Sequence, residues 1–167
     1  MTTAEITKDK LAGLKRAINT LVTTDVLVGI PSTNNARRPD PPDPAAPPNA
    51  VLGFIHEFGS PAQNIPARPF LRPGVADAKD RIAAELKAAA NEALDGKGEA
   101  AVQRRLDRAG LIAQSAVRAK IQSGPFVPLA PKTLAKRRAK GRTGTKPLLD
   151  TGQLRNAVTY VKRKRSK

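Results

Sequence analysis

His56 and the adjacent Glu57 are the only pair from which a metal site or an acid–base site could be built, since the chain has one histidine. A zinc-peptidase helix needs a second histidine four residues after the first, and position 60 is Ser60. The Gly-x-Ser-x-Gly turn of triad hydrolases is missing, and so is cysteine. We therefore expect His56 to be structural or interfacial, and we expect no enzyme, no metal and no cofactor.

The segment Gly141–Lys146 resembles a phosphate-binding loop in composition only. It lacks the Gly-Lys-Ser/Thr ending, and no predicted strand precedes it. We do not expect a nucleotide site there.

Positive charge is concentrated at the C-terminal end. The formal net charge is +16, and residues 131–167 contribute +12, from 13 basic residues and one acidic residue. Such segments bind nucleic acid, anionic membranes or acidic protein surfaces. Because Tyr160 is the only aromatic residue there, stacking on single-stranded bases is not expected. The candidate basic patch is either a phosphate-binding surface or a solvated, partner-facing one, and it consists of Lys132, Lys136, Arg137, Arg138, Lys140, Arg142, Lys162, Arg163, Lys164 and Arg165.

Hydrophobic periodicity predicts the elements that position these residues. Long helices are expected over 4–22, 74–95 and 99–123, short helices over 50–58 and 131–138, and strands over 25–30 and 157–161. The predicted apolar stripes are Ile6, Leu11, Leu14, Ile18 and Leu21 in the first helix, Val75, Ala78, Ile82, Leu86, Ala89 and Ala93 in the second, and Val102, Leu106, Ala109, Ala113, Val117 and Ile121 in the third. The sum is an α+β fold, a single domain over 1–167, in which two or three long helices pack on a small, mostly antiparallel sheet.

The connecting segments are also predicted. Seven of the 15 prolines lie between Pro31 and Pro48, so 31–49 is either a flexible loop or an extended arm that orders on a neighbouring subunit. Asp150 or Thr151 is expected to cap a short turn, and the basic tail 162–167 is expected to fray. Aromatic residues make up only 3% of the chain, so the core is small and aliphatic, and oligomerisation would add stability.

No stretch approaches the roughly 20 apolar residues of a membrane span, and the polar N-terminus does not resemble a signal peptide. We expect a soluble protein, made in the cytoplasm, with no membrane partner.

Two blocks carry the most specific signal. In the first, Ile55–Ser60 is followed by Ile65–Pro73, and its proline content predicts a rigid elbow that directs the next helix. Arg68 and Arg72 flank Phe70 and Leu71 there. Either the arginines solvate the elbow while the apolar pair enters the core, or they lie at a subunit interface, where arginine is enriched. The second block is Lys146–Arg155.

Together, these blocks resemble the Glu-Phe-Gly…Pro-x-Arg-Pro-Phe and Leu-x-Asp-Thr-Gly-x-Leu signatures of tailed-phage tail-completion and head–tail joining (neck) proteins, of the minor tail protein Z and virion morphogenesis types. The resemblance covers roughly residues 4–162, and the order of predicted elements agrees with it. The residues carried over are structural or interface positions: Glu57, Phe58, Gly59, Arg68, Pro69, Phe70, Arg72, Asp150, Thr151, Gly152 and Leu154.

The resemblance implies a structural virion protein that forms a homo-oligomeric ring, a hexamer by family likeness, between the capsid connector or stopper and the tail tube or terminator. The proline-rich arm and the basic C-terminus depart from the family pattern, so a neighbouring subunit is expected to complete the sheet edge by strand addition. Because DNA passes through a neck channel, we expect most of the basic segment to face acidic partner proteins or the outside, with only transient DNA contact. The alternative function is a basic nucleic-acid-binding or DNA-packaging-associated protein.

Overall fold

The computed structural model describes residues 8–40 and 47–165, which divide into two compact units. Unit 1 contains the described residues 8–27, 79–112 and 161–165, and unit 2 contains 28–40, 47–78 and 113–160. These residues form seven α-helices and a two-stranded antiparallel sheet packed against the longest helix, so the predicted α+β class is confirmed.

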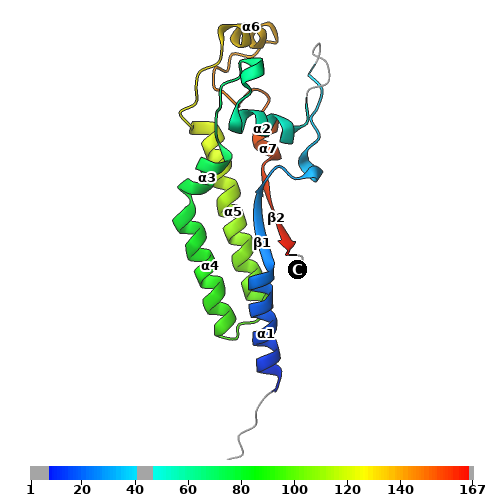
Figure 1. The fold of residues 1–167 in the computed structure, drawn as a ribbon, viewed down its shortest axis with the longest axis vertical. Helices are drawn as coiled ribbons and strands as arrows, with labels where there is room; N and C mark the ends of the chain where they lie inside the picture. The colour runs from blue at the N-terminus through cyan, green and yellow to red at the C-terminus, as the bar shows by residue number, and fades with distance from the viewer. Residues whose placement is uncertain (1–7, 41–46, 166–167) are drawn as a thin grey trace, which may run out of the picture. The chain divides into compact units, whose positions relative to one another are not determined.

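The element order is shown in Figure 1. The helices are α1 (Lys8–Thr23), α2 (Asn49–Phe58), α3 (Leu71–Asp77), α4 (Lys79–Leu94), α5 (Glu99–Ser123), α6 (Pro131–Ala139) and α7 (Gln153–Ala157); the strands are β1 (Thr24–Gly29) and β2 (Thr159–Lys164). Short 3₁₀ turns occupy Ser32–Asn34 and Pro61–Gln63. Among the described residues, no helix is both long enough and apolar enough to cross a lipid bilayer.

Unit 1 has a core of small side chains. α1 packs on α4, and Ala17, Ala89 and Ala93 are buried with Val102 and Leu106. Alanine at these contacts lets helix backbones approach closely. The predicted stripe of α1 was wrong at two described positions, because Leu11 and Ile18 are exposed while Ala17 faces the core. Ile6 lies outside the described residues.

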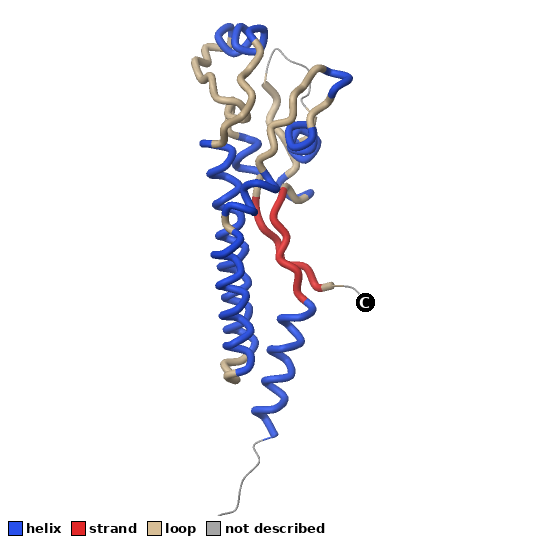
Figure 2. The backbone as a smooth tube through the Cα atoms, turned by 60° about the vertical axis from the view of Figure 1, so that its left-hand side comes forward, coloured by secondary structure: helices blue, strands red, loops and turns tan. Residues whose placement is uncertain are grey.

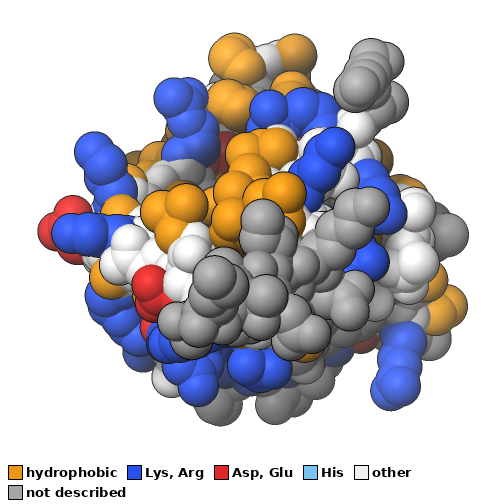
Figure 3. All heavy atoms as spheres, turned by 90° about the horizontal axis from the view of Figure 1, so that it is seen from below, with side chains coloured by type: hydrophobic (Ala, Val, Ile, Leu, Met, Phe, Trp, Pro, Cys, Tyr) orange, Lys and Arg blue, Asp and Glu red, His pale blue; other side chains and the backbone are white. Residues whose placement is uncertain are grey.

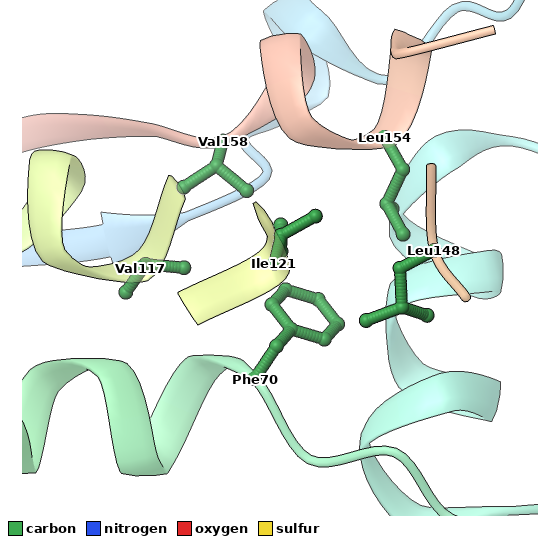
Figure 4. Close-up of a cluster of buried hydrophobic side chains, with 6 residues drawn as sticks. All are labelled: Phe70, Val117, Ile121, Leu148, Leu154 and Val158. Carbon is green, nitrogen blue, oxygen red and sulfur yellow. The ribbon is translucent and has the colours of Figure 1, made fainter. Parts of the chain in front are cut away.

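Unit 2 has the larger core, built from segments far apart in the sequence. Phe70, Val117, Ile121, Leu148, Leu154 and Val158 form one buried cluster, and Figure 4 shows Phe70, Ile121, Leu148 and Leu154 pointing toward one another. α3 crosses α5 at Gly74, where an added Cβ would lie 2.8 Å from the Cα atom of Val117. The glycine therefore sets the distance between these two helices.

The stripe of α5 is confirmed in full, since all six predicted residues are buried. The helix predicted over 74–95 is instead two helices, α3 and α4, separated at Ala78, whose φ of −106° and ψ of 7° leave the helical region. Leu86, a predicted stripe residue, is exposed. Because position 78 is alanine, with neither proline nor glycine there, the sequence contains no local signal for this break.

The described part of the basic tail, residues 162–165, is more ordered than predicted. β2 begins at Thr159, two residues after the predicted start, and continues through Lys162, Arg163 and Lys164 (Figure 2, red strands side by side). The Lys162 ammonium lies 2.8 Å from a carboxylate oxygen of Asp107 on α5. Because an acidic partner neutralises this lysine, the strand extends into a segment that composition alone would leave frayed.

Candidate functional site

The elbow folds back onto the end of α2. Gly59 ends that helix with a φ of +80°, and a Cβ there would lie 2.9 Å from the Ala67 backbone nitrogen. The Arg68 backbone N–H donates to the His56 carbonyl oxygen at 2.6 Å. Only glycine can adopt this φ and leave room for the Ala67 backbone, so Gly59 fixes the conformation of the elbow.

Glu57 joins α2 to α3. Its carboxylate, 7% exposed as a residue, accepts backbone N–H groups from Phe70 at 2.7 Å, Leu71 at 2.8 Å and Arg72 at 3.0 Å. These are the donors that the first turn of a helix leaves without internal partners, and a negative charge there is stabilised by the helix dipole. Glu57 therefore caps α3 from 13 residues upstream.

Arg68 ties the elbow to the segment after α5. Its guanidinium donates from Nε to the Val127 carbonyl at 2.8 Å and from Nη2 to the Pro128 carbonyl at 3.0 Å, and burial lowers its pKa. The interpretation that Arg68 solvates the elbow was wrong, since the residue is 6% exposed. Arg72 is exposed, and its interface role stays a prediction.

The apolar residues of the elbow divide between core and surface. Phe70 is buried and Leu71 packs against the same cluster, as expected. Phe58 is 56% exposed, and its ring centroid lies 4.9 Å from that of Phe54, which is 65% exposed. Pro69 is exposed as well.

The C-terminal block meets the elbow in unit 2. Leu148 and Leu154 enter the same core as Phe70, and Gly152 precedes α7 with a φ of +75°. Gly152 occupies the capping position of α7, and of the two predicted capping residues Thr151 accepts a hydrogen bond from the first residue of the helix, Gln153. The Thr151 hydroxyl lies 3.5 Å from the Gln153 nitrogen, too far for a strong bond.

A cavity of about 270 Å³ lies where these segments converge within unit 2. Its lining contains His56 and the carboxylates Asp40 and Asp150. The cations that line it are Arg37, Arg68, Lys136, Arg137, Lys140 and Arg142. The structure thus brings together the sole histidine, the elbow arginine Arg68, four residues of the predicted basic patch and part of the second sequence block.

Two carboxylates in the lining form ion pairs with some of these cations. Arg142 donates to both oxygens of Asp40, and Lys140 reaches Asp40 Oδ2 at 2.9 Å; these hydrogen bonds hold the pKa of Asp40 well below its usual range. Asp150 Oδ2 accepts from Arg142 at 2.9 Å, and its Oδ1 lies 3.4 Å from Arg137 Nε. Asp150 therefore anchors two arginines, which explains why it does not cap α7.

His56 faces the cavity without a partner at one ring nitrogen. Its Nδ1 atom is buried and has no hydrogen bond, and the same holds for Arg37 Nε. Burial, together with the nearby charges of Arg68 and Arg37, lowers the pKa of His56 to about 4. His56 is thus neutral at pH 7. Among the described side chains, no three His, Cys, Asp or Glu residues are placed to hold a metal ion.

The residues of the predicted basic patch divide between the two units, and several of them pair with carboxylates. Arg137, Lys140 and Arg142 are tied to carboxylates of unit 2. In unit 1, Arg165 and Arg163 approach Asp25, at 2.7 and 3.9 Å, and the hydrogen bond from Arg165 lowers the Asp25 pKa. Lys132, Arg138 and Lys164 are exposed.

The described part of the proline-rich segment is held by its own chain. The Arg38 N–H donates to Gln153 Oε1 at 2.7 Å, and Arg37 Nη1 donates to Asn49 Oδ1 at 3.2 Å. Sequence reasoning missed Arg37 and Asp40 as cavity residues, since neither belongs to a recognisable motif. Residues 41–46 lie outside the described part, so the choice between loop and intersubunit arm stays a prediction.

Comparison of the chain with protein-family models, with curated proteins and with solved structures found no significant match.

Proposed function

We propose that this protein is a structural component of the neck of a tailed-phage virion, where it completes the top of the tail and joins tail to head as a homo-oligomeric ring. Its partners would be the connector or stopper on one side and the tail tube or terminator on the other. Assembly would take place in the host cytoplasm. The resemblance of the two sequence blocks is the starting point, and it suggests six subunits.

The observation that carries the proposal is the structural use of both blocks. Glu57 caps a helix, Arg68 binds backbone carbonyls, and Phe70, Leu148 and Leu154 share one core. The two sequence blocks thus pack together in the fold. This supports the interpretation that they have a structural role, with no catalytic role.

Exposed apolar side chains supply a surface for subunit contacts. Phe54 and Phe58 on α2 lie beside an apolar hollow of about 240 Å³ that Ile30 and Phe70 help to line. Figure 3 also shows hydrophobic side chains at the surface with Lys and Arg around them. We propose a second copy of the chain as the occupant of the α2 face, because a ring requires such a contact at every subunit and aromatic residues concentrate at interface centres.

The competing function is nucleic-acid binding or DNA packaging, favoured by the exposed cations Lys132, Arg138 and Lys164. Light scattering of the purified protein at low and high salt, with and without duplex DNA, separates the two. A discrete oligomer that persists at high salt supports the neck function, since apolar contacts do not weaken with salt. A monomer that binds DNA at low salt and releases it at high salt supports the alternative.

A matched pair of variants sharpens the test. Phe54→Asp should dissolve the oligomer, whereas Phe54→Leu should keep it, since leucine preserves the apolar contact. An oligomer that tolerates Phe54→Asp would remove the α2 face from the proposal.

A further inference from the structure

We propose that the cavity of unit 2 binds the carboxylate of an acidic side chain presented by a peptide segment of another protein. The inference concerns the ligand of this cavity, and it holds whether or not the chain forms rings.

The cavity has an excess of positive charge. Six cationic side chains line it against two carboxylates, which gives a formal excess of +4 with His56 neutral. Arg68 and Arg137 are 6% and 8% exposed. Burying like charges together is costly unless an anion compensates them, and the two internal carboxylates compensate only part of the set.

The cluster already shows which anion it accepts. Arg142 holds Asp40 in a two-pronged arrangement, and Lys140 adds a third donor to the same carboxylate. This is the geometry in which arginine recognises carboxylates most strongly.

Two buried polar atoms in the lining still lack partners. Arg37 Nε is an N–H donor without an acceptor, and His56 Nδ1 is likewise without a hydrogen bond. Buried polar groups in folded proteins nearly always have a partner, so such atoms at a cavity point to a group that arrives from outside. A carboxylate oxygen would satisfy the Arg37 donor.

The apolar part of the lining favours an acidic side chain over a bare phosphate. Leu52, Leu129 and Leu154 border the cavity, and they match the methylene groups of a glutamate. A volume of about 270 Å³ admits one or two such side chains. Duplex DNA, by contrast, presents its phosphates on a convex backbone that an extended surface must follow.

The experiment uses His56 as a spectroscopic probe, since it is the only histidine in the full chain. A short oligoglutamate peptide is titrated at low salt while the NMR signal of the imidazole C–H is followed. We expect a saturable shift and an increase in the His56 pKa from about 4 toward its ordinary value, because a bound anion offsets Arg37 and Arg68.

Two lysines of α6 form a matched pair. Lys136 lines the cavity and is exposed, whereas Lys132 is exposed on the same helix but is not among the lining residues. Lys136→Ala should weaken peptide binding about 5-fold at low salt, the effect of removing one nearby charge, and Lys132→Ala should change it less than about 2-fold. Equal effects of the two variants would mean diffuse charge attraction and would overturn the proposal.

A variant that should bind the peptide more tightly than the wild type excludes the explanation that the substitutions merely disturb the fold. Asp40→Asn removes a competing carboxylate from Lys140 and Arg142, so peptide binding should become tighter. Inorganic phosphate and a short DNA duplex are titrated in parallel under the same conditions. If either ligand shifts His56 at lower concentration than the peptide, or if the peptide leaves His56 unchanged, the assignment fails.

Discussion

Charged side chains are used differently in the two units. In unit 2, the buried residues Glu57 and Arg68 bond to backbone atoms, and buried Arg137 donates to the Gly144 and Lys146 carbonyls. Ion pairs between side chains occur in both units, and in unit 1 Arg105 pairs with carboxylates of α4 without bonding to the backbone. Helices satisfy their own backbone groups, whereas the elbow and the loops of unit 2 need side chains to do so. Charge in unit 2 thus supports the fold itself.

The substitution Glu57→Ala tests this contrast with the largest expected effect on stability. Three backbone N–H groups at the start of α3 would lose their acceptor, and we expect the free energy of unfolding to fall by about 4 kcal/mol. Urea denaturation monitored by circular dichroism measures the loss. Glu85→Ala, which removes a carboxylate paired with Arg105 in unit 1, is the control and should cost far less. Comparable losses would contradict the contrast.

The next effect is a pH dependence carried by His56. The folded protein keeps His56 neutral down to about pH 4, whereas the unfolded chain protonates it near pH 6.5. Between these values the unfolded state binds more protons, so the free energy of unfolding falls as the pH is lowered, by up to about 3 kcal/mol over the range. His56→Gln should remove this slope in urea titrations from pH 7 to 4.5. A variant with an unchanged slope would show that other groups cause it.

Two glycines should respond with opposite signs. Gly74→Ala forces a Cβ to within 2.8 Å of the Val117 Cα atom, and overpacking there should cost about 2 kcal/mol. Gly13→Ala, inside α1 of unit 1, meets nothing within 4 Å and should stabilise the protein by about 0.5–1 kcal/mol through helix propensity. Thermal unfolding of both variants is compared with that of the wild type, and a Gly74→Ala variant that is no less stable than the wild type would refute the close approach of α3 to α5.

The smallest expected effect belongs to Arg105→Ala in unit 1. Arg105 bridges Glu85 and Glu92, and both carboxylates raise its pKa, but all three side chains keep contact with solvent. We expect a small shift in the urea midpoint that disappears at high salt. Arg104→Ala on the exposed side of α5 is the control. A large loss of stability that does not depend on salt would mean that charged side chains support the fold in unit 1 as they do in unit 2.

Regular elements could be predicted from the sequence where one helix face decides burial. All six stripe residues of α5 are buried because the helix has 25 residues and keeps one face toward the cores. The stripe of α1 was right at Leu21, which packs against the same core as Ala17, and wrong at Leu11 and Ile18, which are exposed. Hydrophobicity favours large residues, but here the fit between helices selects small ones.

The candidate site could be predicted only in part. The lysines and arginines of 131–142 are visible as a cluster in the sequence, but Asp40 lies 102 residues from Arg142. The Glu57 cap is similarly hidden, because capping signals normally lie within a few residues of the helix start. Such long-range pairs follow from the tertiary fold, and no local pattern encodes them.

The pairing of β1 with β2 also has a consequence for how the chain is made. Arg165 binds Asp25 across 140 residues of sequence, and its N–H donates to the Thr23 carbonyl at 2.7 Å. Closing so long a loop is slow relative to forming helices. During synthesis, β1 stays unpaired until the 140 residues that separate Asp25 from Arg165 have also left the ribosome. The pairing of the two strands is therefore a late step of folding, and a chain released before β2 is made lacks the strand that would cover β1.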